Sequence, residues 1–335
     1  MEFLPLIWLA LIGFFLLYYA VTDGFDLGIG IMALFSRRKG EPAVMMQSIG
    51  SIWHINQTWL VVLGGMLFGA FPQFYSILFS ALYIPSMVML VGFVLRGVAF
   101  DFREESKNPE SWERIFGLGS LMAALGQGFA LGGLLGGVTV IQGKFAGSVW
   151  DWWNPFSALV AAGVISGYLM LGANYLILKT GNTFQKKCFH RAWVYAIATL
   201  LVSITVHFWL QTKYPQAGLK WTAFPEFYST ALFPFLAGLA FFFYFRSLWR
   251  QQDGTPLLWN ALIILFSFLG VSVTLYPQMI PHVVSPVTVS AAAASRQTLI
   301  FMLVAMGVLI PLILFYTSYT YKVFSGKISG NNDYE

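Results

Sequence analysis

The first long apolar stretch of the chain, LPLIWLALIGFFLLYYAVTDGFDLGIGIMAL at residues 4–34, is long enough to cross a membrane. A transmembrane helix needs about 20 mostly apolar residues to span a hydrocarbon core of about 30 Å. Two carboxylates, Asp23 and Asp26, interrupt the stretch, and glycine and aliphatic residues continue after them. The stretch therefore predicts a first membrane helix that carries two acids within or at the edge of the hydrocarbon.

The composition extends this prediction to all 335 residues. Hydrophobic residues make up 58% of the chain and charged residues only 10%, whereas soluble domains carry roughly 25% charged residues. The apolar runs are continuous and do not alternate, which disfavours a β-barrel. The N-terminal run has no basic region or cleavage site typical of a signal peptide. We predict an all-α integral membrane protein with a single polytopic domain over residues 1–335.

Nine apolar runs have the length of a membrane span. They cover roughly residues 4–34, 48–71, 73–99, 115–141, 155–179, 191–211, 226–247, 257–280 and 296–322. Connections on one side are charged, such as SRRKGEP at 36–42, and the connection at 280–295 on the other side has no charge.

The distribution of the 19 Lys and Arg residues predicts the orientation. Four lie on the side of the N-terminus: Lys144, Lys213, Lys220 and Arg296. The other fifteen lie on the opposite side: Arg37, Arg38, Lys39, Arg96, Arg103, Lys107, Arg114, Lys179, Lys186, Lys187, Arg191, Arg246, Arg250, Lys322 and Lys327. Cytoplasmic loops carry the excess of positive residues. We therefore predict an N-terminus outside and a C-terminus in the cytoplasm.

The predicted fourth span, GLGSLMAALGQGFALGGLLGG at 117–137, is rich in glycine. Gly128, Gly132 and Gly136 recur every four residues and share one face of a helix. Small residues on such a face let a neighbouring helix approach closely. The alternative is an unwound substrate site of a transporter or channel.

Polar residues of the first two spans are predicted at a similar depth. Asp23 lies 19 residues beyond Leu4, which is about 29 Å along an ideal helix and near the cytoplasmic edge of the hydrocarbon. The second span runs in the opposite direction, so GSIWHINQTWL at 50–60 lies in its first turns at the same edge.

The helical faces of these residues suggest a common role. Asp23 and Asp26 share one side of the first helix, and His54 and Gln57 share one side of the second. A carboxylate in lipid costs at least a few kcal/mol, so such faces point into the bundle or toward another protein. Histidine and partly buried carboxylates can change protonation near neutral pH. The group therefore has the components of a proton-conducting inlet.

A structural role is the alternative for each of these residues. The aspartates can cap or bridge helices in ion pairs with Arg37, Arg38 or Arg103. His54 can be a hydrogen-bonded packing residue.

The inner end of the third span, LRGVAFDFR at 95–103, contains Arg96, Asp101 and Arg103. Residues of this kind at the end of a span are commonly interface anchors and ion-pair partners, and we assign them as structural or interface candidates.

The chain offers few ligands for a metal or haem. Its one cysteine, Cys188, excludes an intramolecular disulfide, and it has no CxxCH motif. His207 and His282 are lone histidines near the predicted outer surface, and haem requires a suitably placed axial ligand and a pocket. We predict neither a metal site nor a haem site in this chain.

Several of these segments together resemble the second subunit of cytochrome bd-type quinol oxidases. They are VTDGFDLGIG in the first span, WHINQTWL in the second, LRGVAFDFR in the third, YPQMIPHVVSPVTVSAAAASRQTL at 276–299 and PLILFYTSYTYKVFSGKI at 311–328. The resemblance covers nearly the whole chain, and RGVAFDFR is closer to the cyanide-insensitive branch.

The resemblance implies two four-helix bundles plus one peripheral helix, in a bacterial cytoplasmic (inner) membrane. In that family, ubiquinol or menaquinol supplies the electrons that reduce O2 to water. The haems, b and d or b-type only, belong to subunit I. Subunit II is a haem-free companion that contributes to proton delivery and sometimes holds a structural quinone. For this chain it implies no catalytic residue of its own and an obligate partnership with subunit I. Other implied partners are membrane lipids and, in some complexes, a small single-span accessory subunit, with no nucleic acid.

The resemblance also bears on the proton-pathway candidates. Those that match the family pattern are Asp23, Asp26, Trp53, Asn56 and Gln57. Many members carry an acid after the tryptophan of the second helix, and this chain has His54 at that position. A secondary transporter or channel with a glycine-rich substrate region remains the rival hypothesis, and a membrane scaffold without a chemical role is a third.

Overall fold

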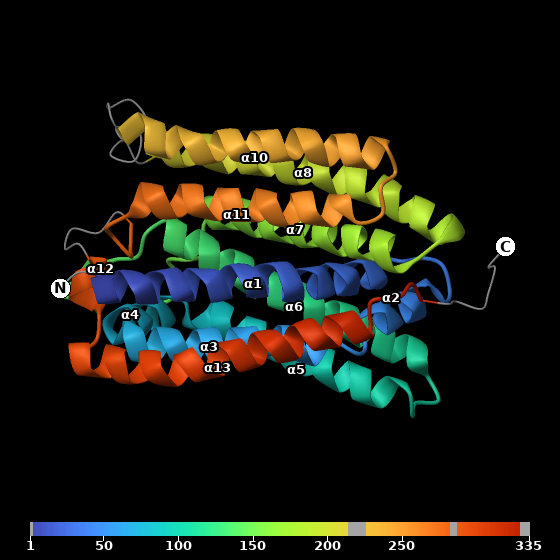
Figure 1. The fold of residues 1–335 in the computed structure, drawn as a ribbon, viewed down its shortest axis with the longest axis horizontal. Helices are drawn as coiled ribbons and strands as arrows, with labels where there is room; N and C mark the ends of the chain where they lie inside the picture. Colours follow the sequence, from blue (N-terminus) through green and yellow to red (C-terminus); the bar gives the residue numbers. More distant parts are fainter. Residues whose placement is uncertain (1–2, 214–225, 282–286, 329–335) are drawn as a thin grey trace.

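The computed structural model describes residues 3–213, 226–281 and 287–328, and its long helices run side by side along one direction (Figure 1). The described helices are α1 (Phe3–Leu34), α2 (Glu41–Ile49), α3 (Trp53–Ala70), α4 (Pro72–Ala81), α5 (Tyr83–Arg103), α6 (Pro109–Leu135), α7 (Pro155–Lys179), α8 (Asn182–Lys213), α10 (Glu226–Trp249), α11 (Thr255–Leu275), α12 (Val289–Ala292) and α13 (Arg296–Val323). The fold is all-α, as predicted. We call the end of the bundle that holds α2 and the C-terminus of α13 the basic end (Figure 1).

Helix α1 is the central element. It packs against α3, α6 and α7, and α2 contacts it as well. Every residue from Thr22 to Ala33 is buried. The two acids of α1 therefore lie in the interior of the protein and not on its lipid-facing surface.

The second and third predicted spans are divided differently in the structure. Residues 48–49 belong to α2, α3 begins at Trp53, and α4 follows α3 with a bend of 120°. Pro72 at the start of α4 lacks the N–H that a continuing helix needs. The range 73–99, predicted as one span, is shared between α4 and α5. Among the described residues, eight helices are long and apolar enough to cross a membrane, or nine if α3 and α4 form one bent span.

Two other boundaries differ from the apolar runs. The fourth span was predicted to end near residue 141, but α6 ends at Leu135 and a short antiparallel hairpin of β1 (Val140–Ile141) and β2 (Lys144–Phe145) follows. Gly137, with φ of 81°, makes the turn away from α6. Helix α8 starts at Asn182, well before residue 191, where the predicted span begins. The charged residues that precede the apolar run therefore form the first turns of the same helix.

The glycine face of α6 is a packing surface. A Cβ atom added to Gly128 would lie 2.5 Å from Ala161 Cα, and one added to Gly132 would lie 2.5 Å from Ser157 Cα. The backbones of α6 and α7 therefore touch along this face, as small residues allow. Gly136 lies directly after the last residue of α6.

Candidate functional site

Three charged side chains from two helices meet in the interior, toward the basic end. Arg96 of α5 donates from Nη2 to Asp23 Oδ1 at 2.6 Å and to Asp26 Oδ2 at 3.4 Å. All three side chains have 0% exposure. The two aspartates, which share one side of α1, therefore share one guanidinium. We call this group the Asp23–Asp26–Arg96 cluster.

Helices α3 and α13 supply the next contacts of this cluster. Asn56 of α3 donates from Nδ2 to Asp26 Oδ2 at 2.9 Å and to the Thr22 carbonyl at 3.3 Å. Its Oδ1 accepts a hydrogen bond of 2.7 Å from the Tyr321 hydroxyl on α13. Asn56 is fully buried, whereas Tyr321 is partly exposed. This branch therefore connects the cluster to α13 at the periphery of the bundle.

A second branch leads from the cluster to α6 and α7. The Tyr19 hydroxyl donates to Asp23 Oδ2 at 3.0 Å and accepts from Gln127 Nε2 at 2.6 Å. Gln127 Oε1 in turn accepts a short hydrogen bond from the Tyr168 hydroxyl. Tyr19 lies one turn before Asp23, so this branch runs along α1 away from the basic end.

Glycines beside the aspartates let neighbouring helices approach α1 closely enough to bury the cluster. A Cβ added to Gly24 would lie 2.8 Å from the ring of Tyr168. One added to Gly172 of α7 would lie 2.7 Å from the backbone nitrogen of Ile29. The DGFDLGIG segment thus combines the two acids with the small residues that bring α7 against them.

The cluster is not fully hydrogen-bonded within the chain. Asp26 Oδ1 and two nitrogens of Arg96, Nε and Nη1, are buried and have no hydrogen-bond partner among the described residues. Buried polar atoms in proteins are usually bonded to protein or to ordered water. These three atoms can therefore bond to water molecules that enter the cluster.

The structure brings one side of α3 onto the cluster. Trp53 is buried, with its ring centroid 5.9 Å from Arg96 Cζ, and Asn56 contacts Asp26 directly. His54 is exposed and Gln57 is half-buried. Among the described residues, neither donates to or accepts from the cluster. The expected convergence of the His54 and Gln57 side chains with the two aspartates therefore does not occur.

The arginines considered as ion-pair partners of the aspartates lie elsewhere. Arg103 donates to Glu113 Oε1 from Nε at 3.1 Å and from Nη2 at 2.9 Å. Arg37 and Arg38 are exposed, and so is Asp101. The cluster uses its own buried arginine because that residue lies inside the bundle, while the others lie at the end of it.

A separate ion-pair group joins α2 to α8 at the basic end. Glu41 accepts hydrogen bonds from Lys187 Nζ at 2.8 Å, from Arg191 Nη2 at 3.1 Å and from the Ser36 hydroxyl at 2.8 Å. Partial burial raises the pKa of Glu41, but the hydrogen bonds from Lys187, Ser36 and Arg191 outweigh this effect. The pKa of Glu41 therefore lies below its usual value.

Three residues of the hydrogen-bonded network were not predicted as site residues: Gln127, Tyr168 and Tyr321. Each lies in a long apolar helix, and a polar group there is a functional candidate. Gln127 within the glycine-rich span was the clearest available signal.

The comparison with known proteins agrees with the site and the fold. The profile of a family described as cytochrome bd terminal oxidase subunit II matches residues 4–324. The chain belongs to this family.

Relatives of this subunit II are similar over nearly their full length. Cytochrome bd-I ubiquinol oxidase subunit 2 of Escherichia coli is 29% identical, covering 98% of this chain and 96% of the relative. Probable cytochrome oxidase subunit 2 of Haemophilus influenzae is 27% identical with the same coverage. The bd oxidase of Geobacillus thermodenitrificans has the same fold, with a TM-score of 0.80 at 17% identity, over 96% of this chain and 99% of that one. The resemblance of the quoted segments is thus confirmed, and the chain is a multi-pass protein of the bacterial cytoplasmic membrane.

The described histidines of this subunit II lie on α3 and α8. His54 and His190 are exposed, and the His207 ring is hydrogen-bonded with Gln211 Nε2 at 2.8 Å. His282 lies outside the described residues. Within residues 3–213, 226–281 and 287–328, no group of three or more His, Cys, Asp or Glu side chains is arranged for a metal ion.

Proposed function

We propose that this chain is the haem-free subunit of a quinol:O2 oxidoreductase. We further propose that its buried cluster delivers protons from the cytoplasm toward the oxygen-reducing haems of subunit I. Reduction of O2 to water consumes protons, so haems buried in a membrane need a proton path. The observation that carries the proposal is the Asp23–Asp26–Arg96 cluster, in which two carboxylates share one guanidinium at 0% exposure.

The charge of this cluster allows it to hold one exchangeable proton. With both aspartates ionised, the two negative charges exceed the single positive charge of Arg96 by one. With one aspartate protonated, the cluster is neutral. A net charge in a desolvated interior is costly, and an isolated acid there would simply stay neutral. Arg96 compensates one carboxylate and leaves the other able to take up and release a proton.

The hydrogen-bonded network offers a way in and a way onward. Tyr321, a partly exposed residue of α13, connects through Asn56 to Asp26. Tyr19 and Gln127 extend from Asp23 toward the middle of the bundle. Because amide side chains are poor proton carriers, the transfer steps beside them use water. The unpartnered atoms of Asp26 and Arg96 support such water.

The finer architecture belongs to the same proposal. We propose nine spans, with α3 and α4 counted as one, arranged as two four-helix bundles plus a peripheral helix. The N-terminus is outside and the C-terminus is inside. The excess of Lys and Arg in the connections at the basic end supports this orientation. It places the cluster toward the cytoplasmic surface, where protons for O2 reduction enter.

The remaining assignments follow from the family. The haems, b and d or b-type only, and the catalytic centres are in subunit I, and ubiquinol or menaquinol supplies the electrons. A structural quinone and a small single-span accessory subunit are further components of the proposed complex. The transporter hypothesis has lost its motivating feature, because α7 covers the glycine face of α6.

The test is Asp26→Asn in the complex of this chain with subunit I. Asparagine keeps the shape and hydrogen-bonding capacity of the side chain but removes the exchangeable proton. We expect an assembled, haem-loaded complex with slower O2 reduction at saturating quinol and an altered pH profile of the rate. Quinol oxidation in single turnover should be less affected, because it takes place outside the proton inlet.

The matched control is Asp101→Asn, which removes an exposed acid from α5. Its rate and pH profile should equal those of the unmodified complex. An Asp26→Asn complex that assembles and turns over normally at every pH would show that the cluster is structural only.

A further inference from the structure

A basic hollow lies at the beginning of α8, apart from the Asp23–Asp26–Arg96 cluster. It is a shallow, open depression on one face of α8, lined by Thr183, Lys186, Lys187, His190 and Arg191. Lys186 and His190 are exposed, and neither has an ion-pair or hydrogen-bond partner among the described residues. The hollow therefore presents hydrogen-bond donors and positive charge at one end of a membrane helix.

The charge of this hollow is only partly compensated. Lys187 and Arg191 share the single carboxylate of Glu41. Counting Lys186 as well, three positive charges face one negative charge and leave an excess of two. Arg191 Nη1 is buried without a hydrogen-bond partner among the described residues. The N-terminus of α8 adds unpaired backbone N–H groups and the positive end of the helix dipole.

An exposed apolar stripe continues from this hollow along α8. His190, Val194, Ile197 and Leu201 lie at i, i+4, i+7 and i+11, so they share one face of the helix. The three apolar residues are 51%, 48% and 60% exposed. From His190 to Leu201 the face is about 16 Å long, close to the depth of one leaflet, which is half of a hydrocarbon core of about 30 Å.

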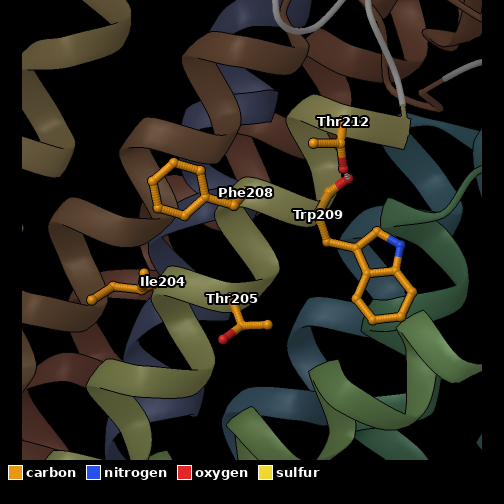
Figure 2. A pocket seen from close by; sticks show the side chains of 5 residues that line it. All are labelled: Ile204, Thr205, Phe208, Trp209 and Thr212. Carbon is orange, nitrogen blue, oxygen red and sulfur yellow. Dashed lines mark hydrogen bonds between the residues drawn. The ribbon is translucent and has the colours of Figure 1, made fainter.

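The same face extends to the other end of α8. Ile204 and Phe208 continue the stripe, and Figure 2 shows their side chains projecting from the helix on the side away from Trp209. Trp209 instead approaches Phe156 of α7, with ring centroids 6.0 Å apart. Among the described residues, the stripe is therefore left exposed along most of α8.

We propose that the hollow binds the phosphate of an anionic phospholipid, whose acyl chains lie along the apolar stripe of α8. The ligand chemistry follows from the arrangement: a phosphate accepts hydrogen bonds from the exposed side chains of Lys186 and His190, and an acyl chain covers Val194 and Ile197. Lysine and arginine residues beside the cytoplasmic end of a membrane helix attract anionic headgroups in this way. A zwitterionic lipid would bring its own cation into a hollow that is already positive.

The test compares lipid binding by the purified, lipid-stripped complex. Phosphatidylglycerol and phosphatidylcholine with identical acyl chains are titrated separately, and bound lipid is counted by native mass spectrometry. We expect tighter binding of phosphatidylglycerol. In the variant Lys186→Gln/His190→Gln, the affinity of the complex for phosphatidylglycerol should be about fivefold lower, because one lysine charge is lost. Arg37→Gln/Arg38→Gln, which removes two exposed charges from the same end of the bundle, should leave it unchanged.

Three results would overturn the proposal. The first is equal binding of the two lipids, or equal losses in the two double variants. The second is displacement of phosphatidylglycerol by millimolar inorganic phosphate, which would identify a site for a free anion. The third is persistent protection of Lys186 from a lysine-acylating reagent after lipid removal, which would mean that protein covers the hollow. Protection that is lost on stripping and restored by phosphatidylglycerol supports the proposal.

Discussion

Arg96→Gln is the substitution for which the structure makes the sharpest statement about stability. The variant removes the one cation that compensates Asp23 and Asp26, while both carboxyl groups stay at 0% exposure. Glutamine can still donate a hydrogen bond, but it carries no charge. Two like charges then face each other in the interior unless at least one carboxyl group takes up a proton.

The expected loss is about 3–5 kcal/mol in the free energy of unfolding, the usual effect of removing one partner of a buried ion pair. The cation–π contact with Trp53 adds little to this, because Arg96 Cζ lies 5.9 Å from the ring centroid. The loss should shrink as the pH falls, because protonation neutralises the unpaired carboxylates. Single Asp23→Asn or Asp26→Asn variants each leave a neutral pair with Arg96 and should be less destabilised.

The decisive comparison is Arg96→Gln against the triple variant Asp23→Asn/Asp26→Asn/Arg96→Gln, which has no buried charge at the site. The Tm of the purified complex is measured for both at neutral and acidic pH. The triple variant should recover much of the Tm lost in the single variant and should not gain further at acidic pH. If the triple variant melts as low as Arg96→Gln at neutral pH, shape and hydrogen bonding, and not charge, account for the role of Arg96.

Three further predictions address other parts of the chain. Gly132→Ala should lower the free energy of unfolding by about 1–3 kcal/mol, because the new methyl group would lie 2.5 Å from an α7 Cα atom. The control is Gly64→Ala, whose methyl group meets nothing within 4 Å. The Tm of the complex should fall for Gly132→Ala and stay unchanged for Gly64→Ala. The pKa of Glu41 is lowered in the folded chain, so ionised Glu41 stabilises the fold above its unfolded-state pKa of about 4.5. This stabilisation is lost as the pH falls through the lower, folded-state pKa. The Tm difference between the unmodified complex and Glu41→Gln should therefore close under strongly acidic conditions, and a difference that is constant with pH would contradict this. His54→Gln should leave the rate of O2 reduction and its pH profile unchanged, because His54 is exposed and outside the hydrogen-bonded network; a slowed, pH-shifted variant would place His54 at the entrance of the inlet.

The amino-acid sequence was sufficient for the class of protein and for the first helix. A chain with 10% charged residues and repeated apolar runs has few soluble alternatives. The spacing of Asp23 and Asp26 put both acids on one face of α1, and both are buried in the structure. Such conclusions need only the helical period and the high cost of placing charge in lipid.

The partners of those acids were decided by the tertiary structure. Several arginines were available near the same end of the bundle, and only the packing of α5, mainly against α6, made Arg96 the one that lies inside. In the first turns of α3, His54, Asn56, Gln57 and Thr58 lie on different sides of the helix, so the sequence alone does not indicate which polar side points inward. The rotation that directs Asn56 and not His54 at the cluster comes from the close packing of neighbouring helices. Local sequence determines which side chains share a face of one helix, whereas contacts between helices distant in sequence determine what that face meets.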